Sequence, residues 1–202
     1  CCGYKGYLLK EFFANYSLHS SDVIINTSDR KVKVLKKSSE NWKISLIDTG
    51  EDTNTAGRIL KIKKYLKDSF LLTYGDGLSN VNINELIKFY KKEKKIACLT
   101  GVQPSGRFGS LKVSQNSNLV EDFVEKPIGD GGWINGGFFV IEPEFLNYID
   151  DDSSILEKYP LEKVAESNQL VAFLHNGFWH CIDTKRDKDN LEEIIKSDKK
   201  IW

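Results

Sequence analysis

The 202-residue sequence contains no methionine, although 40% of its residues are apolar. A complete bacterial-type reading frame begins with methionine unless processing removes it. The chain opens instead on Cys1-Cys2-Gly3, a pattern typical of a strand that runs into a turn and a helix. We therefore expect residue 1 to lie inside a longer protein.

An excess of one charge and a long apolar run are also missing. Lys+Arg and Asp+Glu both total 29, which argues against a nucleic-acid-binding protein that relies on broad positive charge. No apolar run reaches the length of a membrane span, and no basic segment followed by an apolar one marks a secretion signal. We expect a cytoplasmic protein that binds neither nucleic acid nor a membrane.

Cysteine and histidine are scarce. The four cysteines, Cys1, Cys2, Cys98 and Cys181, form no Cys-x-x-Cys pair, which favours free thiols over a disulfide framework or a zinc site. No second histidine lies at a metal-ligand spacing from His180 that fits a helix. We interpret His180 as a packed or hydrogen-bonded residue.

The sequence does contain an alternation of short apolar segments with amphipathic ones. The patterns predict strands at 23–26, 32–35, 44–47, 70–74, 96–102, 120–125, 134–141 and 171–174. They predict helices at 7–16, 59–66, 82–94, 143–149, 160–167 and 187–196. This alternation is typical of an α/β fold, and we expect one domain over 1–202 with a Rossmann-like, mixed but mainly parallel sheet flanked by helices.

Asp76 is the first candidate for chemistry. It lies between Gly75 and Gly77, directly after the apolar run at 70–74. Ligands of open α/β sheets bind beyond the carboxyl ends of the strands, and glycines let a ligand approach the backbone closely. The competing interpretation is an ordinary Asp-Gly turn after a core strand.

Asp183 is a second isolated acid, and it follows the apolar run 178–182. Two carboxylates from separate elements are what a magnesium site needs when phosphate oxygens and water complete the octahedron. We therefore predict that the carboxylates of Asp76 and Asp183 converge on one ion, within about 7 Å of each other.

Glu125 and Lys126 follow the predicted strand at 120–125, where Pro127 ends it. A carboxylate and an ammonium group then lie side by side at the carboxyl end of a strand. The competing interpretation is an exposed surface ion pair.

The run Asn135-Gly136-Gly137 opens another predicted strand. Glycine weakens a strand, so it marks either a bulge or the close approach of a ligand. Asn135 offers a donor and an acceptor that suit sugar hydroxyls. A bulge without a ligand is the alternative.

Together these segments resemble the nucleotide-sugar pyrophosphorylases, also called sugar-1-phosphate nucleotidyltransferases. The resemblance covers nearly the whole chain and rests on the motifs at 1–7, 48–53, 73–77, 104–109, 125–127, 135–139, 177–179 and 183–187. It implies a single nucleotidyltransferase domain that transfers a cytidylyl group from CTP to glucose 1-phosphate, giving CDP-glucose and pyrophosphate. It further implies a homo-oligomer and a role in CDP-sugar and O-antigen-type lipopolysaccharide biosynthesis.

The resemblance also assigns site residues. It implies that Asp76 and Asp183 hold Mg²⁺ and that both are catalytic together with Lys126. It implies substrate contacts from Thr53, Arg58 and Gly75 on the nucleotide side and from Glu125, Lys126, Asn135 and Gly136 on the sugar-phosphate side. The family's Gly-rich, Arg-containing loop has no counterpart in these residues, so we expect the first strand and that loop to be missing. We expect the piece alone to fold poorly and to be inactive.

Two alternatives remain open. Composition and spacing do not identify the base of the nucleotide, so UTP and dTTP remain alternatives to CTP. The choice of CTP rests on the resemblance of the loop at 53–58. A non-catalytic regulatory protein that binds a sugar nucleotide is also compatible with the fold. The presence of both Asp76 and Asp183 favours catalysis, because a sensor has less need of two metal ligands.

Overall fold

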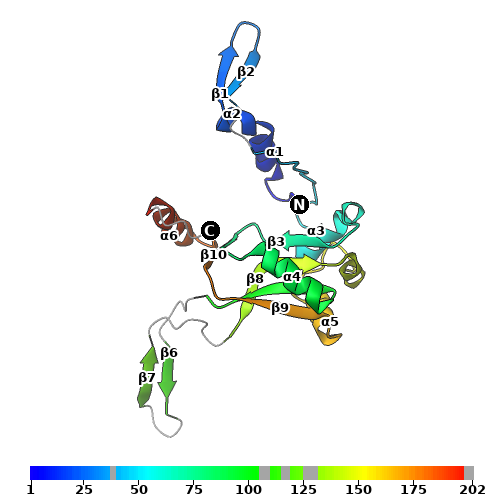
Figure 1. Ribbon diagram of the computed structural model, residues 1–202, viewed down its shortest axis with the longest axis vertical. Helices are drawn as coiled ribbons and strands as arrows, with labels where there is room; N and C mark the ends of the chain where they lie inside the picture. The colour runs from blue at the N-terminus through cyan, green and yellow to red at the C-terminus, as the bar shows by residue number, and fades with distance from the viewer. Residues whose placement is uncertain (37–39, 105–109, 115–118, 125–131, 198–202) are drawn as a thin grey trace. The chain divides into compact units, whose positions relative to one another are not determined.

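The computed structural model describes residues 1–36, 40–104, 110–114, 119–124 and 132–197, and Figure 1 shows the elements that they form. Two compact units are present. The first unit comprises Cys1–Tyr65 and Ile149–Pro160, and the second comprises Leu66–Tyr148 and Leu161–Trp202.

The first unit begins with two short helices and a β-hairpin (Figure 1). Its elements are α1 (Gly6–Ala14), α2 (Tyr16–Ser20), β1 (Asp22–Asn26), β2 (Lys31–Lys36), α3 (Thr55–Lys61) and the 3₁₀ helix η1 (Lys63–Tyr65). Strands β1 and β2 pair antiparallel, with Ile24 opposite Lys33. The predicted strands at 23–26 and 32–35 are confirmed, and the predicted helix at 7–16 is divided in two at Asn15.

The predicted strand at 44–47 is wrong. This segment has no regular secondary structure, and only one parallel bridge, between Cys2 and Asp48, lies next to it. The backbone N–H of Cys2 donates a hydrogen bond to the carbonyl oxygen of Ile47 at 2.7 Å, and the N–H of Thr49 donates one to the carbonyl oxygen of Cys2 at 2.8 Å. An apolar run becomes a strand only where neighbours pair along its length, and here pairing is confined to one end.

Helix α3 begins at Thr55, four residues before the predicted start at Ile59. Its first turn receives partners from a distant segment, since the N–H of Asn54 donates to the carbonyl of Asp152 at 2.9 Å. A Cβ atom on Gly57 would lie 2.5 Å from that same carbonyl oxygen. Only glycine permits this close approach between α3 and the segment at 149–160, which belongs to the same unit.

The second unit carries the main sheet. Its strands are β3 (Phe70–Thr73), β4 (Gly77–Ser79), β5 (Ala97–Val102), β6 (Ser110–Val113), β7 (Val120–Val124), β8 (Ile134–Ile141), β9 (Leu170–His175) and β10 (Trp179–Cys181). Its helices are α4 (Ile83–Glu93), the 3₁₀ helix η2 (Pro143–Tyr148), α5 (Tyr159–Glu166), whose first two residues belong to the first unit, and α6 (Lys185–Lys196).

The predicted mixed sheet of an α/β fold is confirmed. Four strands lie in the order β3-β8-β5-β9, and two further pairs, β10-β4 and β6-β7, are separate. Strand β8 runs antiparallel to both β3 and β5, whereas β5 and β9 are parallel. The parallel share of the described sheet is therefore smaller than predicted, because β8 returns between two strands that it opposes.

Helix α4 packs on this sheet and forms the centre of the core (Figure 1). The side chain of Asn82 accepts the N–H of Glu85 at 3.1 Å, which confirms the predicted helix start. Leu86 and Tyr90 are buried against Cys98 and other core residues, and this burial raises the pKa of the Cys98 thiol to about 11. Burying a side chain such as Leu86 contributes roughly 2 kcal/mol.

The helices of the described residues are short, and the longest of them, α6, has 12 residues. Within the described ranges, no helix is both long and apolar enough to cross a membrane.

Candidate functional site

The turn that holds Asp76 joins two strands of the second unit. Strand β3 ends at Thr73, β4 begins at Gly77, and Asp76 is exposed between them. Gly77 pairs with Cys181, and the N–H of Ile182 donates to the carbonyl oxygen of Asp76 at 2.9 Å. The two segments that carry Asp76 and Asp183 therefore run side by side.

Asp183 lies exposed between the end of β10 and the start of α6. The thiol of Cys181 donates to Oδ2 of Asp183 at 3.2 Å. Thr184 then begins α6 with a capping box, because its hydroxyl accepts the N–H of Asp187 while the Asp187 carboxylate accepts the N–H of Thr184. The hydrogen bond from the Thr184 side chain is the main cause that lowers the pKa of Asp187.

The donors at this edge suit a hard cation. Asp76 and Asp183 offer carboxylate oxygens on neighbouring segments, and Mg²⁺ binds through one or two carboxylates plus phosphate oxygens and water. No group of three or more His, Cys, Asp or Glu side chains capable of holding a metal occurs in the described ranges. Convergence of the two carboxylates on one ion stays a prediction.

The interpretation of His180 as a hydrogen-bonded residue is confirmed. Its Nδ1 lies 2.6 Å from the carbonyl oxygen of Cys181.

Strand β8 bulges where its glycines lie. Leu99 of β5 pairs with Phe139, whereas Gly101 pairs with Asn135, so a single residue of β5 faces three residues of β8. Gly137 has φ +78, a conformation that residues with a Cβ rarely adopt. The bulge, one of the two interpretations of Gly136-Gly137, is present, and the close approach of a ligand there stays a prediction.

Tyr74 holds this bulge from the side of the Asp76 turn. Its N–H donates a hydrogen bond to the carbonyl of Gly137 at 3.1 Å, and its hydroxyl oxygen accepts a hydrogen bond from Nδ2 of Asn135 at 3.1 Å. Oδ1 of Asn135 accepts the N–H of Gly137 at 2.9 Å. The amide of Asn135 is thus oriented by two bonds and retains a further N–H and a further lone pair.

Trp179 reaches the same bulge from β10, and its indole N–H donates to the carbonyl of Gly136 at 2.7 Å. Sequence reasoning placed Trp179 within an apolar run and within the motif at 177–179, and it gave this residue no role. The one available signal was chemical, since a half-buried tryptophan needs a partner for its single N–H.

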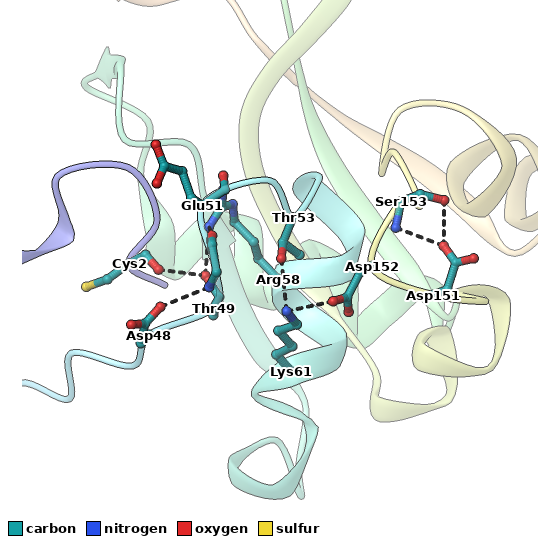
Figure 2. A network of polar contacts seen from close by, with 11 residues as sticks. Cys2, Asp48, Thr49, Glu51, Thr53, Arg58, Lys61, Asp151, Asp152 and Ser153 are labelled. Carbon is teal, nitrogen blue, oxygen red and sulfur yellow. Dashed lines mark hydrogen bonds and ion pairs between the residues drawn. The ribbon is translucent and has the colours of Figure 1, made fainter.

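Arg58 organises a loop of the first unit (Figure 2). Its Nη1 donates to the hydroxyl of Thr49 at 2.8 Å and to the carbonyl of Gly50 at 2.7 Å. Its Nη2 donates to the carbonyl of Glu51 at 3.0 Å. The guanidinium group therefore fixes the backbone of residues 49–51.

Thr53 lies buried at the end of the same loop. Its hydroxyl oxygen accepts a hydrogen bond from Nζ of Lys61 at 3.0 Å, and the same Nζ forms an ion pair with the Asp152 carboxylate at 2.6 Å (Figure 2). Lys61 and Asp152 were missed because nothing local in the sequence connects two segments so far apart in the chain.

The predicted site residues thus fall into three groups. The second unit brings together segments that contain Gly75, Asp76, Asn135, Gly136 and Asp183. The first unit contains Thr53 and Arg58. Glu125 and Lys126 lie outside the described residues, so their assignment to the sugar phosphate stays a prediction.

Comparison with known proteins finds similarity along nearly the whole chain. Residues 7–190 match the family described as nucleotidyl transferase. A glucose-1-phosphate cytidylyltransferase of Salmonella typhimurium is 45% identical over 204 residues, which cover 100% of this chain and 79% of that protein. A probable glucose-1-phosphate cytidylyltransferase of Bacillus subtilis is 38% identical over 99% of this chain and 78% of its own length.

Solved structures share the fold. The crystal structure of HddC from Yersinia pseudotuberculosis matches 74% of this chain and 65% of its own, with a TM-score of 0.55 and 22% identity. A putative glucose-1-phosphate thymidylyltransferase from Bacillus anthracis matches 73% of this chain and 64% of its own, with a TM-score of 0.53 and 13% identity. The chain therefore spans slightly less than two thirds of these structures.

Proposed function

Because the chain belongs to the nucleotidyl transferase family, together with the glucose-1-phosphate cytidylyltransferases, we propose that the protein transfers a cytidylyl group from CTP to glucose 1-phosphate. The products are CDP-glucose and pyrophosphate. The proposal rests on the 45% identity that extends over the whole chain.

The reaction is an in-line displacement at phosphorus. A phosphate oxygen of glucose 1-phosphate forms a bond to the α-phosphorus of CTP, and the bond from that phosphorus to the bridging oxygen breaks. Pyrophosphate leaves with the electron pair. No side-chain nucleophile is needed, because the phosphate oxygen of glucose 1-phosphate is itself the nucleophile. The protein contributes alignment and neutralisation of charge.

Asp76 and Asp183 would hold Mg²⁺, and when bound the ion would offset the charge of the phosphates. Asp76 lies in the turn between β3 and β4, Asp183 lies two residues after the end of β10, and the hydrogen bond from the N–H of Ile182 to the carbonyl of Asp76 keeps the two segments in register. The Cys181 thiol orients the Asp183 carboxylate by donating to Oδ2.

The sugar phosphate would contact Asn135 and Gly136, with Glu125 and Lys126 as further partners. The amide of Asn135 is already oriented by Tyr74 and Gly137, and its second N–H and lone pair suit a hydroxyl. Lys126 would act as a point charge on the phosphate.

On the nucleotide side, we propose contacts from Gly75, Thr53 and Arg58. Arg58 supports this role by fixing the loop at 49–51 through three hydrogen bonds, so the backbone groups of that loop are ordered before the nucleotide arrives.

The test measures pyrophosphate release by the full-length protein with glucose 1-phosphate and CTP, UTP, dTTP or GTP in turn. We expect release with CTP and a product with the mass of CDP-glucose. Release only with UTP or dTTP would correct the base while keeping the reaction. Binding of CDP-glucose without release from any triphosphate would favour the regulatory protein instead.

We further propose that the protein works in the cytoplasm, supplies CDP-glucose for O-antigen-type polysaccharide and forms a homo-oligomer. Apolar side chains of the β1–β2 hairpin support the last point, since Ile24, Ile25 and Leu35 are 53%, 57% and 55% exposed. Light scattering of the full-length protein tests the oligomer, because a monomeric mass at micromolar concentration would exclude it.

A further inference from the structure

We propose that Trp179 is a positioning residue, whose indole N–H holds the β8 bulge in the conformation that presents Asn135 and Gly136 to the sugar phosphate. The inference rests on the proposed function, because it concerns the same site.

Trp179 joins the metal-binding and sugar-binding sides of the second unit. It lies on β10, which leads to Asp183, and its Nε1 lies 2.7 Å from the carbonyl oxygen of Gly136 on β8. The contact passes close to Gly77, where an added Cβ would lie 4.0 Å from Nε1 and 3.8 Å from that oxygen. The hydrogen bond therefore connects β10 to β8 and lies beside the turn that carries Asp76.

The bulge needs such a partner because the φ and ψ angles of glycine are less restricted than those of other residues. Two successive glycines have wide conformational freedom, and Gly136 is itself buried. Tyr74 fixes the bulge at Gly137 and Asn135, and Trp179 fixes the intervening carbonyl of Gly136. Loss of the indole N–H leaves a buried carbonyl without this donor and frees the peptide between the glycines to rotate.

Two roles of Trp179 can be separated by substitution: packing depends on its ring, whereas positioning depends on its N–H. Phenylalanine retains an aromatic ring but has no N–H, so Trp179→Phe removes the donor while keeping most of the packing. Trp42→Phe is the matched control, since Trp42 is 60% exposed and lies in the first unit.

The kinetic experiment measures KM and kcat of the full-length protein for both substrates. We expect Trp179→Phe to raise the KM for glucose 1-phosphate about 5- to 10-fold, the size of effect expected for one lost hydrogen bond, and to leave the KM for CTP within about twofold. Trp42→Phe should change neither constant. Unchanged kinetics, or an equal rise in both KM values, would overturn the proposal.

A second readout does not depend on turnover. Hydrogen exchange of the Gly137 N–H, followed by NMR without substrates, should accelerate in Trp179→Phe and stay unchanged in Trp42→Phe. If the wild-type protein does not turn over CTP, the proposed function fails and the exchange data alone decide whether Trp179 holds the bulge. Equal Gly137 exchange in the two variants would overturn that role.

Discussion

At the scale of single residues, Asp76 shows what a local pattern can predict. A carboxylate flanked by two glycines after an apolar run was expected at the end of a strand, and it lies exposed between β3 and β4. Trp179 could not be predicted in the same way, because the sequence shows only that it is apolar and large. Its partner, Gly136, is found only after β8 and β10 are placed together.

Asp76→Asn keeps the shape of the side chain and removes its charge. We expect kcat to fall by at least about a hundredfold, because an amide holds a divalent cation far more weakly than a carboxylate does. Because Asp76 is exposed, the melting temperature should stay within about 2 °C of the wild-type value. Asp68→Asn removes another exposed carboxylate of the same unit and serves as the control. Turnover of Asp76→Asn within threefold of the wild-type rate would rule out a metal ligand at this position.

Lys126→Ala tests the sugar-phosphate side. We expect the KM for glucose 1-phosphate to rise at least about tenfold, since a charge-assisted contact is lost, and the KM for CTP to change little. The control is Lys91→Ala, which removes an exposed ammonium group from α4. A larger effect on CTP than on glucose 1-phosphate would instead place Lys126 beside the nucleotide.

At the scale of elements, helices were easier to predict than pairings. Asn82 followed by Glu85 marks the start of α4 within the sequence itself, and the structure confirms it. The apolar run at 44–47 resembles a strand equally well, yet it forms none, because a strand depends on distant neighbours. The antiparallel direction of β8 depends on such neighbours too and is invisible to local periodicity.

The start of α6 gives a pH-dependent prediction. The Asp187 carboxylate accepts from the N–H and hydroxyl of Thr184, which lowers its pKa in the folded state. A lowered folded pKa means that the carboxylate stabilises the fold above its unfolded pKa, and that this stability is lost as pH falls through the folded value.

We therefore expect Asp187→Asn to melt at a lower temperature than the wild-type protein at pH 7, and the difference to shrink as the pH is lowered from about 5 to 3. Thermal unfolding of both proteins across this range measures the effect. Asp189→Asn, which alters an exposed carboxylate of the same helix outside the capping box, is the control. A difference that stays constant with pH would mean that the charge of Asp187 is not what supports the cap.

At the scale of the whole molecule, the sequence predicted one domain over 1–202, and the structure divides into two compact units. Each unit contains one buried thiol, since Cys2 lies in the first and Cys98 in the second. The two thiols therefore report separately on the opening of each unit, because a buried thiol reacts only after local or global unfolding.

We expect Cys2 to become reactive at a lower urea concentration than Cys98. The first unit exposes many apolar side chains of α1 and the β1–β2 hairpin, whereas Cys98 is enclosed by α4, β8 and β9 and its burial raises its pKa to about 11. Labelling with iodoacetamide at increasing urea, followed by peptide mass spectrometry, measures both thiols, and a Cys1→Ser background removes the exposed neighbour of Cys2. Coincident midpoints would mean that both units unfold as the single cooperative domain expected from the sequence, because labelling of either thiol would then require the same transition.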